Sequence, residues 1–102
     1  MCKFICNAFS LQMVKPSCYN LAVNPITADE FDVLKKNIPS AVGHSDTANV
    51  LGVVCNRVNV SLDFGDTIAV AQLQGGRLPE GATTLPQGFS FKYYTVTIIN
   101  PA

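Results

Sequence analysis

Hydrophobic and polar positions change their spacing several times along the chain, and each change marks an expected element. Residues 3–9 (KFICNAF) are rich in β-forming side chains and end at the polar Ser10, which predicts a first strand ending near Asn7. A short extended piece is expected over residues 21–23, and Pro25 is expected to break it. Functional groups are therefore expected at the C-terminal tip of the first strand.

The next segment has the spacing of a helix. Thr27 followed by Glu30 is typical of a capping box, in which two side chains satisfy free backbone N–H groups at a helix start. Phe31 and Leu34 continue at helical spacing. This helix is expected to stop before Pro39, because the residue before a proline avoids the helical conformation.

A second helix is expected after a glycine turn. Ser45 or Asp46 is expected to cap it, and residues 50–54 give it a broad apolar face as it runs to about Cys55. Gly52 lies inside this predicted helix and weakens it, so neighbouring elements must supply its stability.

The second half of the chain has the period of β-strands. Apolar and polar residues alternate over 56–62, a turn is expected over 63–66, and residues 67–73 (TIAVAQL) predict a strand buried on both faces. These two strands are expected to form a hairpin. A loop over 77–81 is too rich in glycine and proline to be regular, and residues 89–99 predict a long final strand.

This order of elements defines the expected fold class. Strand, helix, helix and then three strands predict an α/β or α+β domain, a mixed β-sheet of about five strands flanked by two or more helices. A chain of 102 residues suits a single domain over 1–102.

Composition and charge narrow the possible partners. Hydrophobic residues make up 48% of the chain and charged residues 14%, so we expect some apolar surface to face another subunit. Seven basic and seven acidic residues cancel, which gives no field for steering toward duplex DNA. No apolar run approaches the roughly 20 residues that span a bilayer, and we expect a cytoplasmic protein without an export signal.

The cysteines do not have the spacing of a metal site. They lack close pairs and a histidine at ligand distance, so the sequence predicts no metal and no cofactor. We expect reduced thiols, with Cys6 in a strand and Cys55 at the end of an apolar helix face. The four residues are Cys2, Cys6, Cys18 and Cys55.

His44, the single histidine, lies where a glycine turn meets the predicted second helix. A helix N-terminus favours a bound phosphate, and an imidazole beside a phosphate is able to protonate a leaving group near neutral pH. The plain alternative is that His44 is a surface or capping residue.

Other candidate residues lie at the ends of expected elements, where folds often place sites. Asn7 and Ser10 follow the first strand, Arg57 opens the alternating segment, and Arg77 and Glu80 share a loop. Each has a structural alternative: a turn and a cap, a charge at the rim, and a local ion pair of little energetic value. No standard hydrolase motif is present.

Four segments together resemble the viral ring nuclease family of type III anti-CRISPR proteins. The similarity extends from about Phe4 to the last strand. The segments are CNAFS (6–10), AVGHSDT (41–47), NRV (56–58) and RLPEG (77–81).

The resemblance implies an enzyme that acts on a cyclic nucleotide. It implies a homodimer that binds cyclic tetra-adenylate, the messenger of type III CRISPR immunity, in a pocket across the subunit interface. Cleavage would give linear di-adenylate through a 2′,3′-cyclic phosphate, without a metal, and would switch off the signal in the host cell cytoplasm if the gene is carried by a phage.

The resemblance also implies roles for individual residues. His44 would protonate the departing 5′-oxygen, Arg77 would neutralise charge on the scissile phosphate, and Glu80 would assist the attacking hydroxyl or orient His44. The family positions that bind ligand correspond to Asn7, Ser10 and Arg57, and backbone N–H groups from Gly43 to Ser45 would add a phosphate cradle. Two alternatives stay open: a non-catalytic sponge for the cyclic oligonucleotide, and a host-protein-binding regulator of a mobile element.

Overall fold

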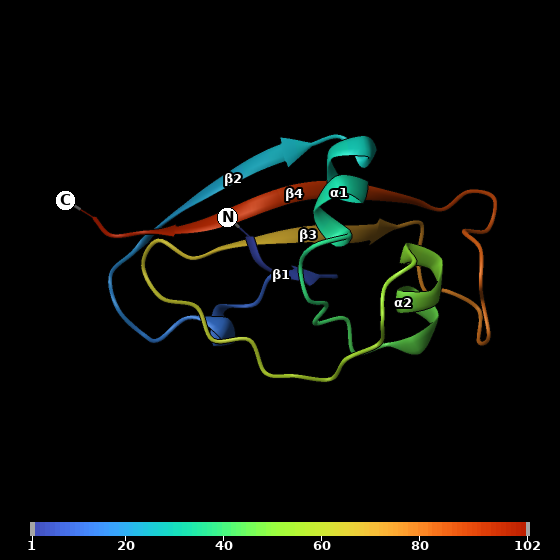
Figure 1. Ribbon diagram of the computed structural model, residues 1–102, viewed down its shortest axis with the longest axis horizontal. Helices are drawn as coiled ribbons and strands as arrows, with labels where there is room; N and C mark the ends of the chain where they lie inside the picture. The colour runs from blue at the N-terminus through green and yellow to red at the C-terminus, as the bar shows by residue number, and fades with distance from the viewer. Residues whose placement is uncertain (1, 102) are drawn as a thin grey trace.

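Four strands form one mixed sheet, in the order β1-β3-β4-β2, in the computed structural model of the chain, which describes residues 2–101 (Figure 1). β1 lies parallel to β3, whereas β4 is antiparallel to both β3 and β2. This is the expected α+β class with a mixed sheet. The strands are β1 (Cys2–Cys6), β2 (Asn20–Ile26), β3 (Thr67–Gln74) and β4 (Ser90–Ile99).

β2 is longer than its sequence predicts. It continues through Pro25, which is paired with Tyr94 of β4, although Pro25 was expected to break the strand. β2 is an edge strand, so its outer side needs no partner. A proline, which lacks the N–H group, is tolerated at such an edge.

The first helix, α1 (Ala28–Lys35), begins as predicted. The Thr27 hydroxyl accepts a hydrogen bond from the Glu30 N–H at 3.1 Å, and the Glu30 carboxylate accepts one from the Thr27 N–H at 3.1 Å. Phe31 is buried beneath the helix, with its ring 4.9 Å from that of Tyr93 on β4. The capping box thus fixes the start of α1 and leaves its apolar face on the sheet.

The second helix, α2 (Ser45–Leu51), is shorter than predicted. His44 is its N-cap, rather than Ser45 or Asp46, and Gly52 ends it with a left-handed φ of 74°. Glycine adopts this conformation without steric cost, which makes it a common helix terminator. Cys55 was expected on this helix, but it lies beyond the helix end and is exposed.

The strand expected over residues 56–62 does not form. This segment is irregular, with a single bridge from Leu62 to Val14, and the predicted hairpin with β3 is wrong. Both edges of β3 are already occupied, by β1 and β4. Two of its apolar residues still reach the core on the sheet face opposite the helices, because Leu62 is buried and Val60 packs against it, whereas Val58 is exposed.

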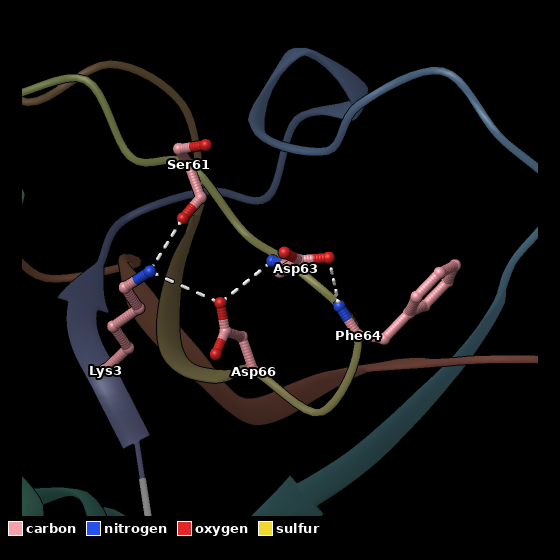
Figure 2. Close-up of polar contacts among 5 residues, drawn as sticks. All are labelled: Lys3, Ser61, Asp63, Phe64 and Asp66. Atoms are coloured by element: carbon pink, nitrogen blue, oxygen red, sulfur yellow. Dashed lines mark hydrogen bonds and ion pairs between the residues drawn. The ribbon is translucent and has the colours of Figure 1, made fainter.

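The turn expected over residues 63–66 is present and is held by polar contacts (Figure 2). One carboxylate oxygen of Asp66 accepts hydrogen bonds from the Asp63 N–H at 2.8 Å and from the Lys3 ammonium group at 3.3 Å. Lys3 also donates to the Ser61 carbonyl at 2.9 Å. These contacts lower the pKa of Asp66, chiefly through the hydrogen bond from Asp63.

The sheet has a hydrophobic core on each face. Alternate residues of β3 serve the two sides, since Ala69 and Ala71 face the helices while Ile68 and Val70 face the long loops. The helix side buries Ile5, Phe31, Val42, Ala48, Leu51, Ala69 and Ala71. The loop side buries Cys6, Val14, Leu62, Ile68, Val70, Val96 and Ile98. Within residues 2–101, no helix is long and apolar enough to span a membrane.

Residues 39–41 run parallel to β1 at the edge of the sheet. The Ile5 N–H donates to the Pro39 carbonyl at 2.9 Å, and the Ala41 N–H donates to the Ile5 carbonyl at 2.8 Å. Three parallel segments therefore end near one another, namely 39–41, β1 and β3. In Figure 1, α2 lies at this same end of the sheet.

Candidate functional site

A cavity of about 610 Å³ lies between the C-terminal end of β3 and the first turn of α2, where His44 is the N-cap. The carboxyl ends of parallel strands are a common location for ligand sites, because several loops meet there. The three residues expected to be catalytic, His44, Arg77 and Glu80, all line this cavity. Its lining residues are His44, Asp46, Thr47, Leu73, Gly76, Arg77, Leu78 and Glu80.

His44 is fixed by its backbone and leaves its side chain free of a capping role. Its carbonyl accepts a hydrogen bond from the Ala48 N–H at 2.9 Å, which begins α2. The imidazole makes no capping hydrogen bond and is exposed. The plain alternatives for His44 were a capping residue and a surface residue. The structure does not have the side-chain capping role.

Arg57 holds the residue that precedes His44. Its Nε donates to the Gly43 carbonyl at 2.8 Å. A Cβ atom on Gly43 would lie 3.3 Å from Cγ of Arg57, so the guanidinium stem packs closely on the glycine backbone. Arg57 thereby fixes the chain on the N-terminal side of His44.

Arg77 and Glu80 come from the loop between β3 and β4. Leu78 is buried and anchors this loop, while both charged residues are exposed. The Ala82 N–H donates to the Pro79 carbonyl at 3.2 Å, and Gly81 has a φ of 78°. A positive φ at the third position is typical of a type II turn, and this turn carries Glu80 at its second position.

Asp46 joins the two halves of the cavity. Its Oδ1 accepts a hydrogen bond from the Gly81 N–H at 3.0 Å, so the first turn of α2 is tied to the turn that carries Glu80. The sequence predicts only a capping role for Asp46 and does not predict this contact.

The charges around the cavity are mixed. Arg77 supplies one cation, and Asp46 and Glu80 supply two carboxylates. Within residues 2–101, the ion pairs are Lys3–Asp66 and Lys35–Asp32, so Arg77 and Glu80 do not form the local pair considered as an alternative. An imidazole can transfer a proton, a carboxylate can accept one, and a guanidinium can bind phosphate oxygens. The cavity thus combines the groups needed for acid–base work on an anion.

Comparison with known proteins identifies the family. The family model described as STIV B116-like matches residues 3–91. The chain belongs to the STIV B116-like family. Among solved structures, B116 of Sulfolobus turreted icosahedral virus is similar, with a TM-score of 0.74 and 21% sequence identity over 95% of this chain and 99% of that one.

This relationship agrees with the observed fold and fits a viral protein. At 21% identity, the likeness to the solved B116 structure shows a shared fold. A search of curated proteins finds no match to the sequence.

The other predicted ligand residues of this STIV B116-like chain do not line the His44 cavity. Ser10 caps a short 3-10 helix over Leu11–Met13, where its hydroxyl accepts from the Gln12 N–H at 3.2 Å, and it borders a different cavity. Asn7 lies directly after β1 and is half-buried, and Ser45 is the exposed first residue of α2. Gly43 and Arg57 contact each other next to His44.

The cysteines of this B116-like chain are all free thiols. Cys6 is buried in β1 as expected, and burial raises its pKa to about 11, so the thiol stays protonated at neutral pH. Within residues 2–101, no group of three or more His, Cys, Asp or Glu side chains is arranged to hold a metal ion.

Proposed function

We propose that this protein is a viral ring nuclease that binds cyclic tetra-adenylate and cleaves it to linear di-adenylate. The observation that supports this proposal most strongly is the meeting of His44, Arg77 and Glu80 on one cavity, although they come from two segments far apart in the sequence. The same three residues are those to which the resemblance assigns the chemistry. The family relationship to a viral protein agrees with an activity directed against host immunity.

The proposed reaction is an internal transfer at phosphorus. A ribose 2′-oxygen forms a bond to the adjacent phosphorus while the bond from phosphorus to the 5′-oxygen breaks, which leaves a 2′,3′-cyclic phosphate. His44 gives its proton to the departing 5′-oxygen. Glu80 accepts the proton of the 2′-hydroxyl; in the variant of the mechanism in which Glu80 instead orients His44, that proton passes to the bulk solvent. No water molecule is consumed in this step, because the 2′-oxygen of the ring replaces the 5′-oxygen on phosphorus.

Arg77 would bind the non-bridging oxygens of the scissile phosphate. A planar guanidinium donates two parallel hydrogen bonds to such oxygens and stabilises the charge that develops as the 2′-oxygen attacks. The exposed position of Arg77 on the cavity wall leaves its donors available to a ligand. A local cation is needed, because the net charge of the chain is zero and gives no long-range attraction.

We also propose that the active form is a homodimer in the host cytoplasm. The cavity of one subunit is open and would contact only part of a ring of four nucleotides, whereas a two-fold axis would supply an identical second half. Large apolar side chains remain exposed and agree with a subunit interface, and the zero net charge gives no field for steering toward duplex DNA. Examples are Val23 and Leu21 of the edge strand β2, which are 52% and 39% exposed.

The test is a product assay with purified protein. We would incubate it with cyclic tetra-adenylate in the presence of EDTA and resolve the products by chromatography, with the Arg77→Ala variant as the matched control. The proposal predicts linear di-adenylate from the wild type and little product from the variant. An intact ring that stays tightly bound would instead indicate a sponge, and an intact ring with no binding would favour the host-protein regulator; either result would overturn the nuclease.

A further inference from the structure

The cavity is assembled from two parts that a single hydrogen bond joins. His44 lies at the start of α2, and Arg77 and Glu80 lie in the loop over residues 75–89. Strand-pairing hydrogen bonds aside, one hydrogen bond within residues 2–101 joins this loop to the rest of the chain. It runs from the Gly81 N–H to the Asp46 carboxylate. The relative position of the three reacting groups therefore depends on Asp46.

We propose that Asp46 is a positioning residue, which holds the Arg77–Glu80 loop closed against His44. This inference rests on the proposed function for its catalytic consequence, but the loop closure itself is independent of any ligand. Asp46 contacts the backbone of the loop, so it acts through the placement of the turn and not through contact with the reacting atoms.

The geometry of the turn explains why a contact at Gly81 controls Glu80. The two residues are the central pair of the turn from Pro79 to Ala82, and the peptide group between them contains the N–H that Asp46 accepts. In a type II turn this central N–H points away from the turn's own hydrogen bond. Fixing it fixes the orientation of the peptide plane from which the Glu80 side chain leaves.

The part of the loop around Glu80 is weakly held. Leu78 is its buried anchor, while Arg77, Pro79, Glu80 and Gly81 are exposed. A loop with few buried apolar contacts opens at low free-energy cost. Loss of one hydrogen bond is then expected to raise the open population several-fold.

The charge of Asp46 separates positioning from ligand binding. A carboxylate on the cavity wall repels an anionic ligand, so Asp46 is not suited to bind a phosphate directly. The side-chain oxygen of asparagine accepts the same hydrogen bond without the negative charge. Asp46→Asn is therefore expected to keep the loop closed, whereas Asp46→Ala is expected to release it.

Limited proteolysis tests the closure without any ligand. Trypsin cleaves after Arg77 when the loop opens, and mass spectrometry gives the rate at this one bond. We expect cleavage about fivefold faster in Asp46→Ala, and within about twofold of wild type in Asp46→Asn. Asp29→Ala is the matched control, because Asp29 occupies the same second position in α1 and lies on a different element. Equal cleavage in wild type and Asp46→Ala would overturn the proposal.

Steady-state kinetics with cyclic tetra-adenylate test the catalytic consequence. We expect kcat to fall at least about tenfold in Asp46→Ala, with a smaller change in KM, and at least a third of kcat to return in Asp46→Asn. An Asn variant as slow as the Ala variant would show that charge matters rather than position, and would overturn the assignment. If the wild type does not cleave the ring, the proposed function fails, while the proteolysis result still decides the closure.

Discussion

The side chains of Asp66 and His44 differ in what they contribute to the fold: that of Asp66 stabilises a turn, and that of His44 makes no capping contact. Asp66 accepts hydrogen bonds from two groups and stabilises the turn before β3. His44 supplies only its backbone to the start of α2, and its imidazole makes no capping contact. A side chain with no structural role, on the wall of a cavity, is available for chemistry.

The stabilising role of Asp66 predicts a pH-dependent effect. We expect Asp66→Asn to lower the free energy of unfolding by about 0.5–1 kcal/mol at pH 7, a value kept small because the carboxylate is partly exposed. The folded pKa of Asp66 lies below its ordinary value of 3.8, so its contribution is present above that pH and is lost as the pH falls through the folded pKa. Urea denaturation of both proteins from pH 7 to pH 2 measures this.

In that series, the difference between wild type and Asp66→Asn should shrink below pH 3.8. A difference that is the same at pH 7 and at pH 2 would mean that the Asp66 charge contributes nothing to stability.

At the scale of elements, the sequence predicts the start of α1 but not the pairing of the strands. The capping box of Thr27 and Glu30 depends on residues three apart, so the sequence alone predicts the start of α1. The alternation over 56–62 indicates a half-buried segment, and Val60 and Leu62 do reach the core. Strand pairing also needs a free neighbour, and β1 and β4 occupy both sides of β3. The apolar spacing over 50–54 places Gly52 inside the helix, whereas its left-handed φ of 74° makes it the C-cap.

The Gly75–Gly76 pair at the end of β3 gives a prediction at this scale. Both residues have positive φ, 109° and 119°, but a Cβ on Gly75 would lie 2.7 Å from the Gly88 carbonyl oxygen, whereas one on Gly76 would meet nothing within 4 Å. We expect Gly75→Ala to lower the free energy of unfolding by at least about 2 kcal/mol, from backbone strain and the close contact together. Gly76→Ala should lower it by about 1 kcal/mol, from backbone strain alone.

Urea denaturation of these two variants measures the difference. Equal losses of stability would show that the close approach of Gly75 to Gly88 does not constrain the β3–β4 loop.

At the scale of the whole molecule, the site is a product of topology. His44, Arg77 and Glu80 were identified from the sequence as separate candidates, and the parallel arrangement of β3 with β1 and residues 39–41 brings them to one edge. The contact between Asp46 and Gly81 spans 35 positions along the chain, so no local pattern predicts it. Ser10 was expected at the ligand, but within one chain it caps a 3-10 helix and borders another cavity.

The most direct test of the account is the role of His44, measured as rate and affinity in the same variant. The free energy of unfolding of His44→Ala should lie within about 0.5 kcal/mol of the wild-type value, because the imidazole makes no capping contact. It should bind cyclic tetra-adenylate with similar affinity and cleave it about 10²–10⁴-fold more slowly in a single turnover. A variant that folds, binds the ring and cleaves it at the wild-type rate would contradict the proposed function of this site.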